Sequence, residues 1–154
     1  MIETQNKTPN ISLFTIGFSQ KSAGKFFELL QGAGIKIILD IRLNNKSQLA
    51  GFTKKGDFEY FLKTIAHIDY KHLPELAPDI NLLHDYQRKA IAWEEYERRF
   101  LELLISRNVQ ELVNPEELNH ACLLCSEATP QKCHRRLVAE YFASIWPNII
   151  IKHL

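Results

Sequence analysis

The stretch that decides the fold is SLFTIGFSQKSAGKFFELLQGAGIKIILDI, residues 12–41. Two short apolar runs, 12–17 and 35–41, enclose a segment whose apolar residues recur at the spacing of a helix. Ser22 is suited to cap the start of that helix, and the glycines that follow it are suited to end it. A helix that connects two buried strands predicts a βαβ unit with parallel strands.

The rest of the chain continues this alternation. We predict further helices at 57–66, 79–89, 93–107 and 129–145, and further strands at 68–73, 121–125 and 148–153. The pattern predicts an α/β fold, a three-layer sandwich with a mostly parallel sheet of about five strands. A length of 154 residues, 45% of them hydrophobic, fits one domain over residues 11–154, preceded by a flexible polar lead over residues 1–10.

The composition of the chain limits the cellular locations and the binding partners that we expect for the protein. No apolar run approaches the roughly 20 residues that span a bilayer, and the N-terminus lacks the apolar segment of a signal peptide, so we expect no membrane partner. Three cysteines are an odd number, which argues against a complete disulfide framework and fits a reducing compartment, and this predicts a cytoplasmic protein. A net charge of +1 lacks the strong positive field of a non-specific nucleic-acid binder, although a local basic patch would still allow nucleic acid.

The segment CSEATPQKCHR, residues 125–135, holds the most informative group of polar side chains. It follows a predicted strand, and open parallel sheets bind ligands at the carboxyl ends of their strands. The Thr-Pro pair at 129–130 predicts a helix start, which places Cys133, His134 and Arg135 in the first two turns. Cationic side chains there oppose the helix dipole, and a bound anion relieves this conflict, which predicts an anion site.

These residues have alternative roles. Cys133 is either a thiolate nucleophile, activated by the helix start and nearby cations, or a small buried residue. His134 is either a core histidine or a group that contacts a ligand. Glu127 can act as a general base or bind a ribose-like hydroxyl, or it can anchor Arg135 or His134. If the chain is a catalyst, we expect Glu127 or His134 to be its acid or base.

The pair Cys122 and Cys125, with Cys133 and His134 added, would give four potential zinc ligands. Residues three apart in a strand point to opposite faces, so the side chains of Cys122 and Cys125 cannot bind one ion. We therefore predict no metal site and a packing role for Cys122.

A second polar group follows the second strand. Asp40 and Arg42 alternate along its end and therefore share one face. We assign Arg42 to anion binding and Asp40 to orienting it, the alternative being a solvated turn. The next loop offers further polar donors, Ser47 among them.

Three motifs carry a resemblance to a known family. TIGFS (15–19), DIR (40–42) followed by Ser47, and LLCSEATPQKCHR (123–135) resemble the domain of unknown function 488 family, over residues 13–154. The family often has His where this chain has Phe18. The resemblance implies an α/β fold, and it marks as site candidates Gly17, Ser19, Asp40, Arg42, Ser47, Glu127, Cys133, His134 and Arg135. It implies no particular activity or cofactor, and labels that link the family to DNA repair are weak support.

The leading functional hypothesis is an enzyme or sensor domain for a small phosphate-bearing, nucleotide-like ligand. The ligand would occupy an anion pocket at the carboxyl ends of the strands, held by Arg42, Arg135 and backbone N–H groups. The alternative is a nucleic-acid-binding module that uses the basic helix start and the lysines at 46, 54 and 55. A protein-interaction surface on the helix at 93–107 ranks third, because its charges fit a solvated face.

Overall fold

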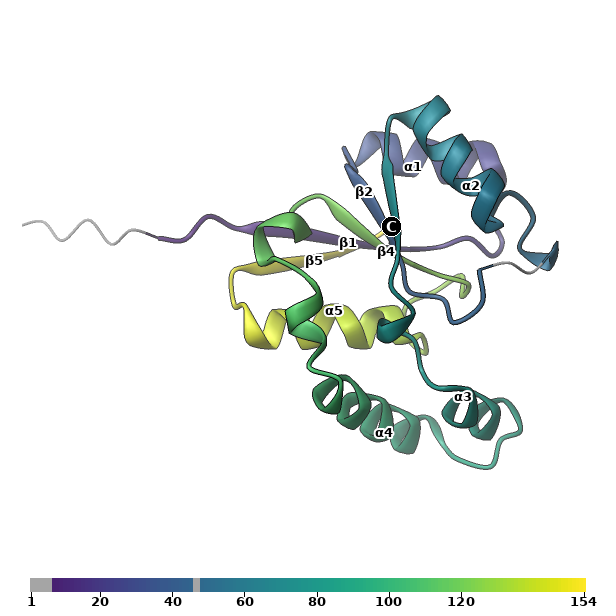
Figure 1. Ribbon diagram of the computed structural model, residues 1–154, viewed down its shortest axis with the longest axis vertical. Helices are drawn as coiled ribbons and strands as arrows, with labels where there is room; N and C mark the ends of the chain where they lie inside the picture. The colour runs from purple at the N-terminus through teal and green to yellow at the C-terminus, as the bar shows by residue number, and fades with distance from the viewer. Residues whose placement is uncertain (1–6, 46–47) are drawn as a thin grey trace, which may run out of the picture.

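The computed structural model describes residues 7–45 and 48–154; residues 1–6 of the predicted lead, the predicted site residue Ser47, and Lys46 of the nucleic-acid alternative lie outside the described residues. The strands are β1 (Ile11–Gly17), β2 (Ile37–Asp40), β3 (Asp69–His72), β4 (Ala121–Cys125) and β5 (Ile149–His153). They form one all-parallel sheet in the order β3-β2-β4-β1-β5 (Figure 1). The predicted α/β fold with a parallel five-stranded sheet is confirmed.

Helices cover both faces of this sheet. They are α1 (Ala23–Gly32), α2 (Lys55–Phe61), α3 (Ile80–Gln87), α4 (Trp93–Ser106) and α5 (His134–Ile145). Short 3-10 helices lie at Gln48–Thr53, Pro74–Leu76, Val109–Leu112 and Pro115–Leu118, and a π-helical turn at Leu62–Ala66 follows α2. In Figure 1, α1 and α2 lie on one side of the sheet, and α5, α4 and α3 lie on the other. In the part of the chain that the structure describes, no helix has the length and apolar character needed to cross a membrane.

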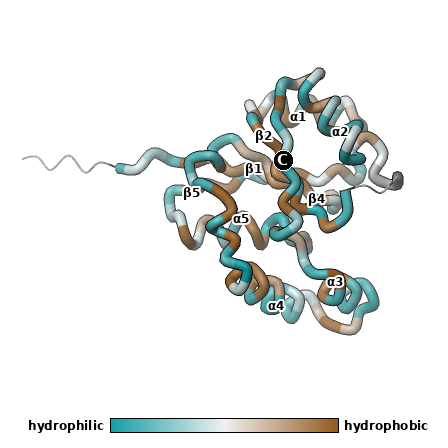
Figure 2. The backbone as a smooth tube through the Cα atoms, in the orientation of Figure 1, coloured by the Kyte–Doolittle hydropathy of each residue, from teal (hydrophilic) through white to brown (hydrophobic). Residues whose placement is uncertain are grey.

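Each face of the sheet has its own apolar core. Phe26 and Leu30 of α1 pack with Phe58 of α2 against one face, in a core that also contains Cys122. Leu104 of α4 belongs to the core on the other face, together with residues of α5. Figure 2 shows hydrophobic residues along β4 and mixed faces on the helices, as expected for buried parallel strands with amphipathic covers.

The last helix begins later than the sequence predicts. Helix α5 starts at His134 with Cys133 as its N-cap residue, so the prediction of a start at Thr129 is wrong. Carbonyl oxygens in the preceding segment are used by arginine side chains: that of Glu127 accepts from Arg135 Nη1, and that of Gln131 accepts from Arg136 Nε at 3.1 Å. These bonds give the two carbonyl oxygens partners other than the N–H groups of a helix. The segment is therefore a loop, and side chains of α5 hold it in place.

Candidate functional site

A cavity of about 400 Å³ opens at the carboxyl edge of the sheet. Three of the predicted site residues, Arg42, Glu127 and His134, line it together with Cys125. An apolar wall, to which Leu43, Ile80 and Leu83 contribute, comes from the segment after β2 and from α3. The fold thus brings the ends of β2 and β4 together at one small cavity, as expected for an open parallel sheet.

Arg42 is held in place by a buried network. Asp40 is fully buried and accepts from Arg42 Nε at 2.9 Å and from Nη2 at 2.7 Å. Arg42 Nη1 and Nη2 also donate to the Thr53 hydroxyl and carbonyl oxygens, at 3.0 and 2.6 Å. Phe18 lies under the guanidinium, with its ring centre 5.4 Å from Cζ. Arg42 therefore reaches the cavity as a fixed positive charge, with most of its donors already engaged.

Tyr70 and Asn45 complete this network, although neither was among the predicted site residues. Tyr70 Oη donates to Asp40 Oδ2 at 2.6 Å, and Asn45 Nδ2 donates to Tyr70 Oη at 2.8 Å. Burial, followed by the hydrogen bond to Asp40, raises the pKa of Tyr70 above its ordinary value. The tyrosine hydroxyl therefore stays protonated and remains a donor.

Arg135 is fully buried and has an unusual set of partners. Its Nη1 donates to the Glu127 carbonyl oxygen at 2.5 Å and lies 3.2 Å from Cys125 Sγ, while Nε donates to Thr15 Oγ1 at 3.3 Å. Within the described residues it forms no ion pair, and its Nη2 has no hydrogen-bond partner. Burial lowers the pKa of Arg135, yet a guanidinium stays charged at neutral pH. Among the residues that the structure describes, the edge of the sheet therefore holds a buried positive charge without a carboxylate partner.

Arg135 affects the pKa and the hydrogen bonding of neighbouring residues. Burial and, second, the Arg135 charge lower the pKa of Lys21. Thr15 Oγ1 also lies 2.6 Å from His153 Nδ1, so that Arg135, Thr15 and His153 form one chain of hydrogen bonds. Thr15 begins the TIGFS motif, but its pairing with His153 could not be predicted, because it depends on β1 and β5 lying side by side.

Gly17 and Ser19 contribute through the backbone. A Cβ on Gly17 would overlap the Glu127 carbonyl oxygen and come within 2.6 Å of Arg135 Nη1. The Ser19 backbone N–H donates to the Ser126 carbonyl oxygen at 3.1 Å. Both candidates therefore fix the loop before α5, with Gly17 providing the space in which Arg135 and Glu127 meet.

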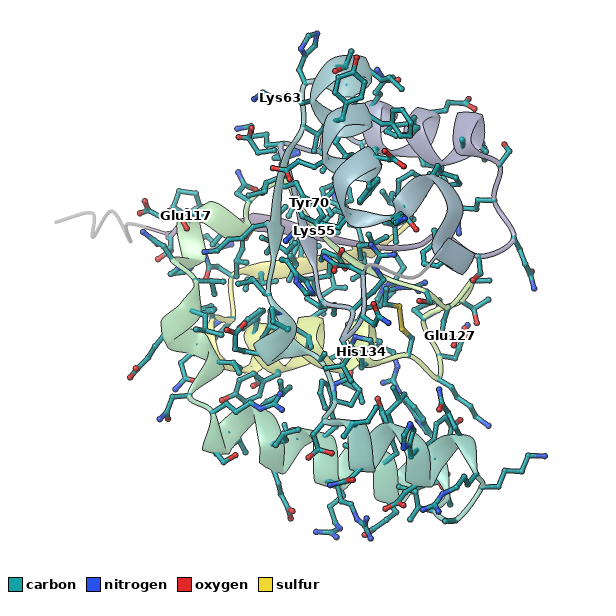
Figure 3. All side chains as sticks on the ribbon, turned by 45° about the vertical axis from the view of Figure 1, so that its right-hand side comes forward. Lys55, Lys63, Tyr70, Glu117, Glu127 and His134 are labelled. Atoms are coloured by element: carbon teal, nitrogen blue, oxygen red, sulfur yellow. A yellow bond between two sulfur atoms is a disulfide. The ribbon has the colours of Figure 1, made fainter. Side chains whose placement is uncertain are left out.

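Cys133 and His134 lie at the start of α5 beside Cys125. The two cysteines are both buried, and the structure joins them as a disulfide, drawn in yellow near His134 and Glu127 in Figure 3. His134 Nε2 lies 2.7 Å from the Ile41 carbonyl oxygen. Burial is the main factor that lowers the pKa of His134 to about 4, so the imidazole is neutral at pH 7.

Sequence reasoning missed that Cys125 is the partner of Cys133. The available signal was its position as the last residue of β4, at the edge where the other candidates gather. Cys122 lies in the core on the opposite face, which confirms that the two strand cysteines point apart. One turn into α5, Arg136 forms an ion pair with Glu140 at 3.0 Å.

The fold and the side chains at the carboxyl edge of the sheet define the class of protein. It is an all-parallel α/β protein with cysteine, histidine and arginine side chains around a small cavity. The chain belongs to the DUF488 family, because the family model described as Domain of unknown function DUF488 matches residues 22–142. The matched region contains the 40–42 and 125–135 motifs, whereas Gly17 and Ser19 precede it. A search of the curated proteins finds no match, and a search of the solved structures finds none.

Proposed function

We propose that this protein binds a small phosphate-bearing ligand of nucleotide type in the cavity at the carboxyl edge of the sheet. The observation that carries this proposal is the cavity itself, which has a fixed guanidinium on one side and apolar side chains on the other. Its volume of about 400 Å³ lies in the range of small-molecule sites. Leu43 and Ile80 are exposed apolar side chains on its wall and suit the flat face of a base.

The buried charge of Arg135 favours an anionic group in this cavity, whereas the charge of Arg42 is balanced by Asp40 and its guanidinium offers hydrogen-bond geometry rather than net charge. Arg42 lines the cavity, while Arg135 is buried behind it and acts through its field, since no ligand can reach a fully buried guanidinium. Charges in a low-dielectric surrounding are weakly screened, so the unpaired Arg135 raises the affinity for a phosphate nearby.

Processing of the ligand is part of the same hypothesis. Glu127 has an exposed side chain at the cavity and is the best-placed acid or base. The neutral His134 already uses Nε2 at the Ile41 carbonyl, and Cys133 is buried. A cytoplasmic, reducing location suits this site because it favours free thiols at Cys125 and Cys133.

Ser126→Asp tests the cavity with an added negative charge. In a thermal-shift screen with nucleotides and inorganic phosphate, we expect wild type to be stabilised by at least one phosphate compound. The new carboxylate, at an exposed position that lines the cavity, would repel that ligand and weaken its binding by about tenfold or more. Isothermal titration measures the affinity directly.

Ser144→Asp is the matched control, because it adds the same charge at an exposed position near the far end of α5. It should leave the ligand affinity unchanged. A screen without any stabilising phosphate compound, or equal losses in the two variants, would contradict the proposal. Binding of oligonucleotides that weakens steeply with salt would favour the nucleic-acid alternative instead.

A further inference from the structure

Three side chains that are ordinary zinc ligands meet beside the cavity. Cys125, Cys133 and His134 each offer one ligand atom, and these atoms all lie within 4.8 Å of one another. Two cysteines and one histidine form a known catalytic zinc set, in which a fourth position stays open. Cys125 ends β4 and Cys133 caps α5, so the backbone of the fold positions both sulfur atoms.

His134 is prepared for this role by its hydrogen bond. The Ile41 carbonyl oxygen, 2.7 Å from Nε2, can only accept, so Nε2 carries the ring proton. Nδ1 then keeps a free lone pair for a metal ion. Metal-binding histidines commonly donate their other ring nitrogen to a backbone carbonyl in this way.

Arg135 offers N–H donors to both sulfur atoms. Its Nη1 lies 3.2 Å from Cys125 Sγ and 3.8 Å from Cys133 Sγ. A buried cation without a neighbouring anion destabilises the fold, and no carboxylate pairs with Arg135 in the described part of the chain. In the reduced protein, thiolates of Cys125 and Cys133 would supply this negative charge, and the thiolate is the form of cysteine that binds metals, whereas a disulfide carries no charge.

The distance between the Cα atoms of the two cysteines also favours a metal site. Their Cα atoms lie 7.7 Å apart, whereas most disulfides hold these atoms about 4.4 to 6.8 Å apart. A zinc–sulfur bond is about 2.3 Å long, so two sulfur ligands of one ion sit farther apart than in a disulfide. Their backbones are correspondingly wider apart, as they are here.

We infer that reduced Cys125 and Cys133, together with His134, bind one zinc-type divalent cation at the edge of the cavity. Both Cys125 and His134 line the cavity, so the open fourth position would face a ligand bound there. The prediction of no metal site rested on Cys122, which does lie on the opposite face. The loop before α5 brings Cys133 to Cys125 in its place.

Titration with Co²⁺ tests this site without any nucleotide. The full chain is purified under a phosphine reductant, stripped with a chelator and titrated while the near-ultraviolet spectrum is recorded. We expect one Co²⁺ per chain, a thiolate-to-cobalt charge-transfer band, and displacement of the cobalt by an equal amount of Zn²⁺.

Single variants assign the ligands. Cys125→Ser and Cys133→Ser should each weaken Co²⁺ binding by about 100-fold and reduce the charge-transfer band by about half. His134→Gln keeps a side-chain N–H for the Ile41 carbonyl and should weaken binding at least about tenfold. Cys122→Ser changes a buried free cysteine on the other face and should leave stoichiometry and affinity unchanged.

The number of Co²⁺ ions bound per wild-type chain tests the inference even if a variant fails to fold. Reduced wild type with three titratable thiols but no bound Co²⁺ would overturn the inference. So would a Cys125–Cys133 disulfide that persists under the reductant, or a loss in Cys122→Ser equal to that in Cys125→Ser. Because no nucleotide is present, these outcomes are separate from failure of the phosphate-binding proposal.

Discussion

Gly17→Ala is expected to lower the free energy of unfolding by about 3 kcal/mol or more. The added methyl group would overlap the Glu127 carbonyl oxygen and approach Arg135 Nη1 to 2.6 Å. Neither neighbour can retreat cheaply, because the carbonyl is backbone and Arg135 is fully buried. Urea denaturation followed by circular dichroism measures the loss, and the slope of the transition shows whether folding remains two-state.

Gly24→Ala is the matched control for this effect. Gly24 lies in α1, and apart from its chain neighbours and the backbone of α1, no atom of the described residues lies within 4 Å of a Cβ placed there. Alanine is the better helix former, so this variant should be unchanged or more stable by up to about 1 kcal/mol. If Gly17→Ala were as stable as Gly24→Ala, the close packing of β1 against the loop before α5 would be disproved.

The course of the strands could be predicted because β1, β2 and β4 lie in short runs rich in apolar residues and β5 begins with three isoleucines, whereas β3 has the polar sequence DYKH. Strand β4 matches its predicted range, and β1 and β5 differ from theirs by one residue. The start of α5 could not be predicted in the same way. Its position depends on Arg135, whose guanidinium binds a carbonyl eight residues earlier in the chain, and local cap signals do not report such a bond.

Part of the candidate site could also be predicted from the sequence. Side chains at the carboxyl ends of strands meet at one edge, which is why Arg42 and His134 were recognised and line one cavity. Contacts between distant segments left no periodic signal. Thr53 holds Arg42 from eleven residues away, and Thr15 meets Arg135 across the sheet, so neither role could be seen in the sequence.

Asp40→Asn is expected to lower the free energy of unfolding by about 3 to 5 kcal/mol, because it leaves the Arg42 charge buried without a carboxylate. Asp40 is fully buried, and Arg42 is 4% exposed. Asp40 accepts from the Arg42 backbone N–H, from Nε and Nη2, and from the Tyr70 hydroxyl. An amide nitrogen at this position would face some of these donors with a donor of its own. Urea denaturation measures the loss.

The exposed pair of Lys63 and Asp69 provides the comparison, since the same Asp→Asn change there removes an ion pair of 2.8 Å in solvent. Asp69→Asn should cost no more than about 1 kcal/mol. In the double variant Asp40→Asn/Arg42→Gln, the unpaired charge is removed as well, so part of the lost stability should return. A double variant that is no more stable than Asp40→Asn would show that the lost hydrogen bonds of Asp40, rather than the unpaired Arg42 charge, dominate the cost.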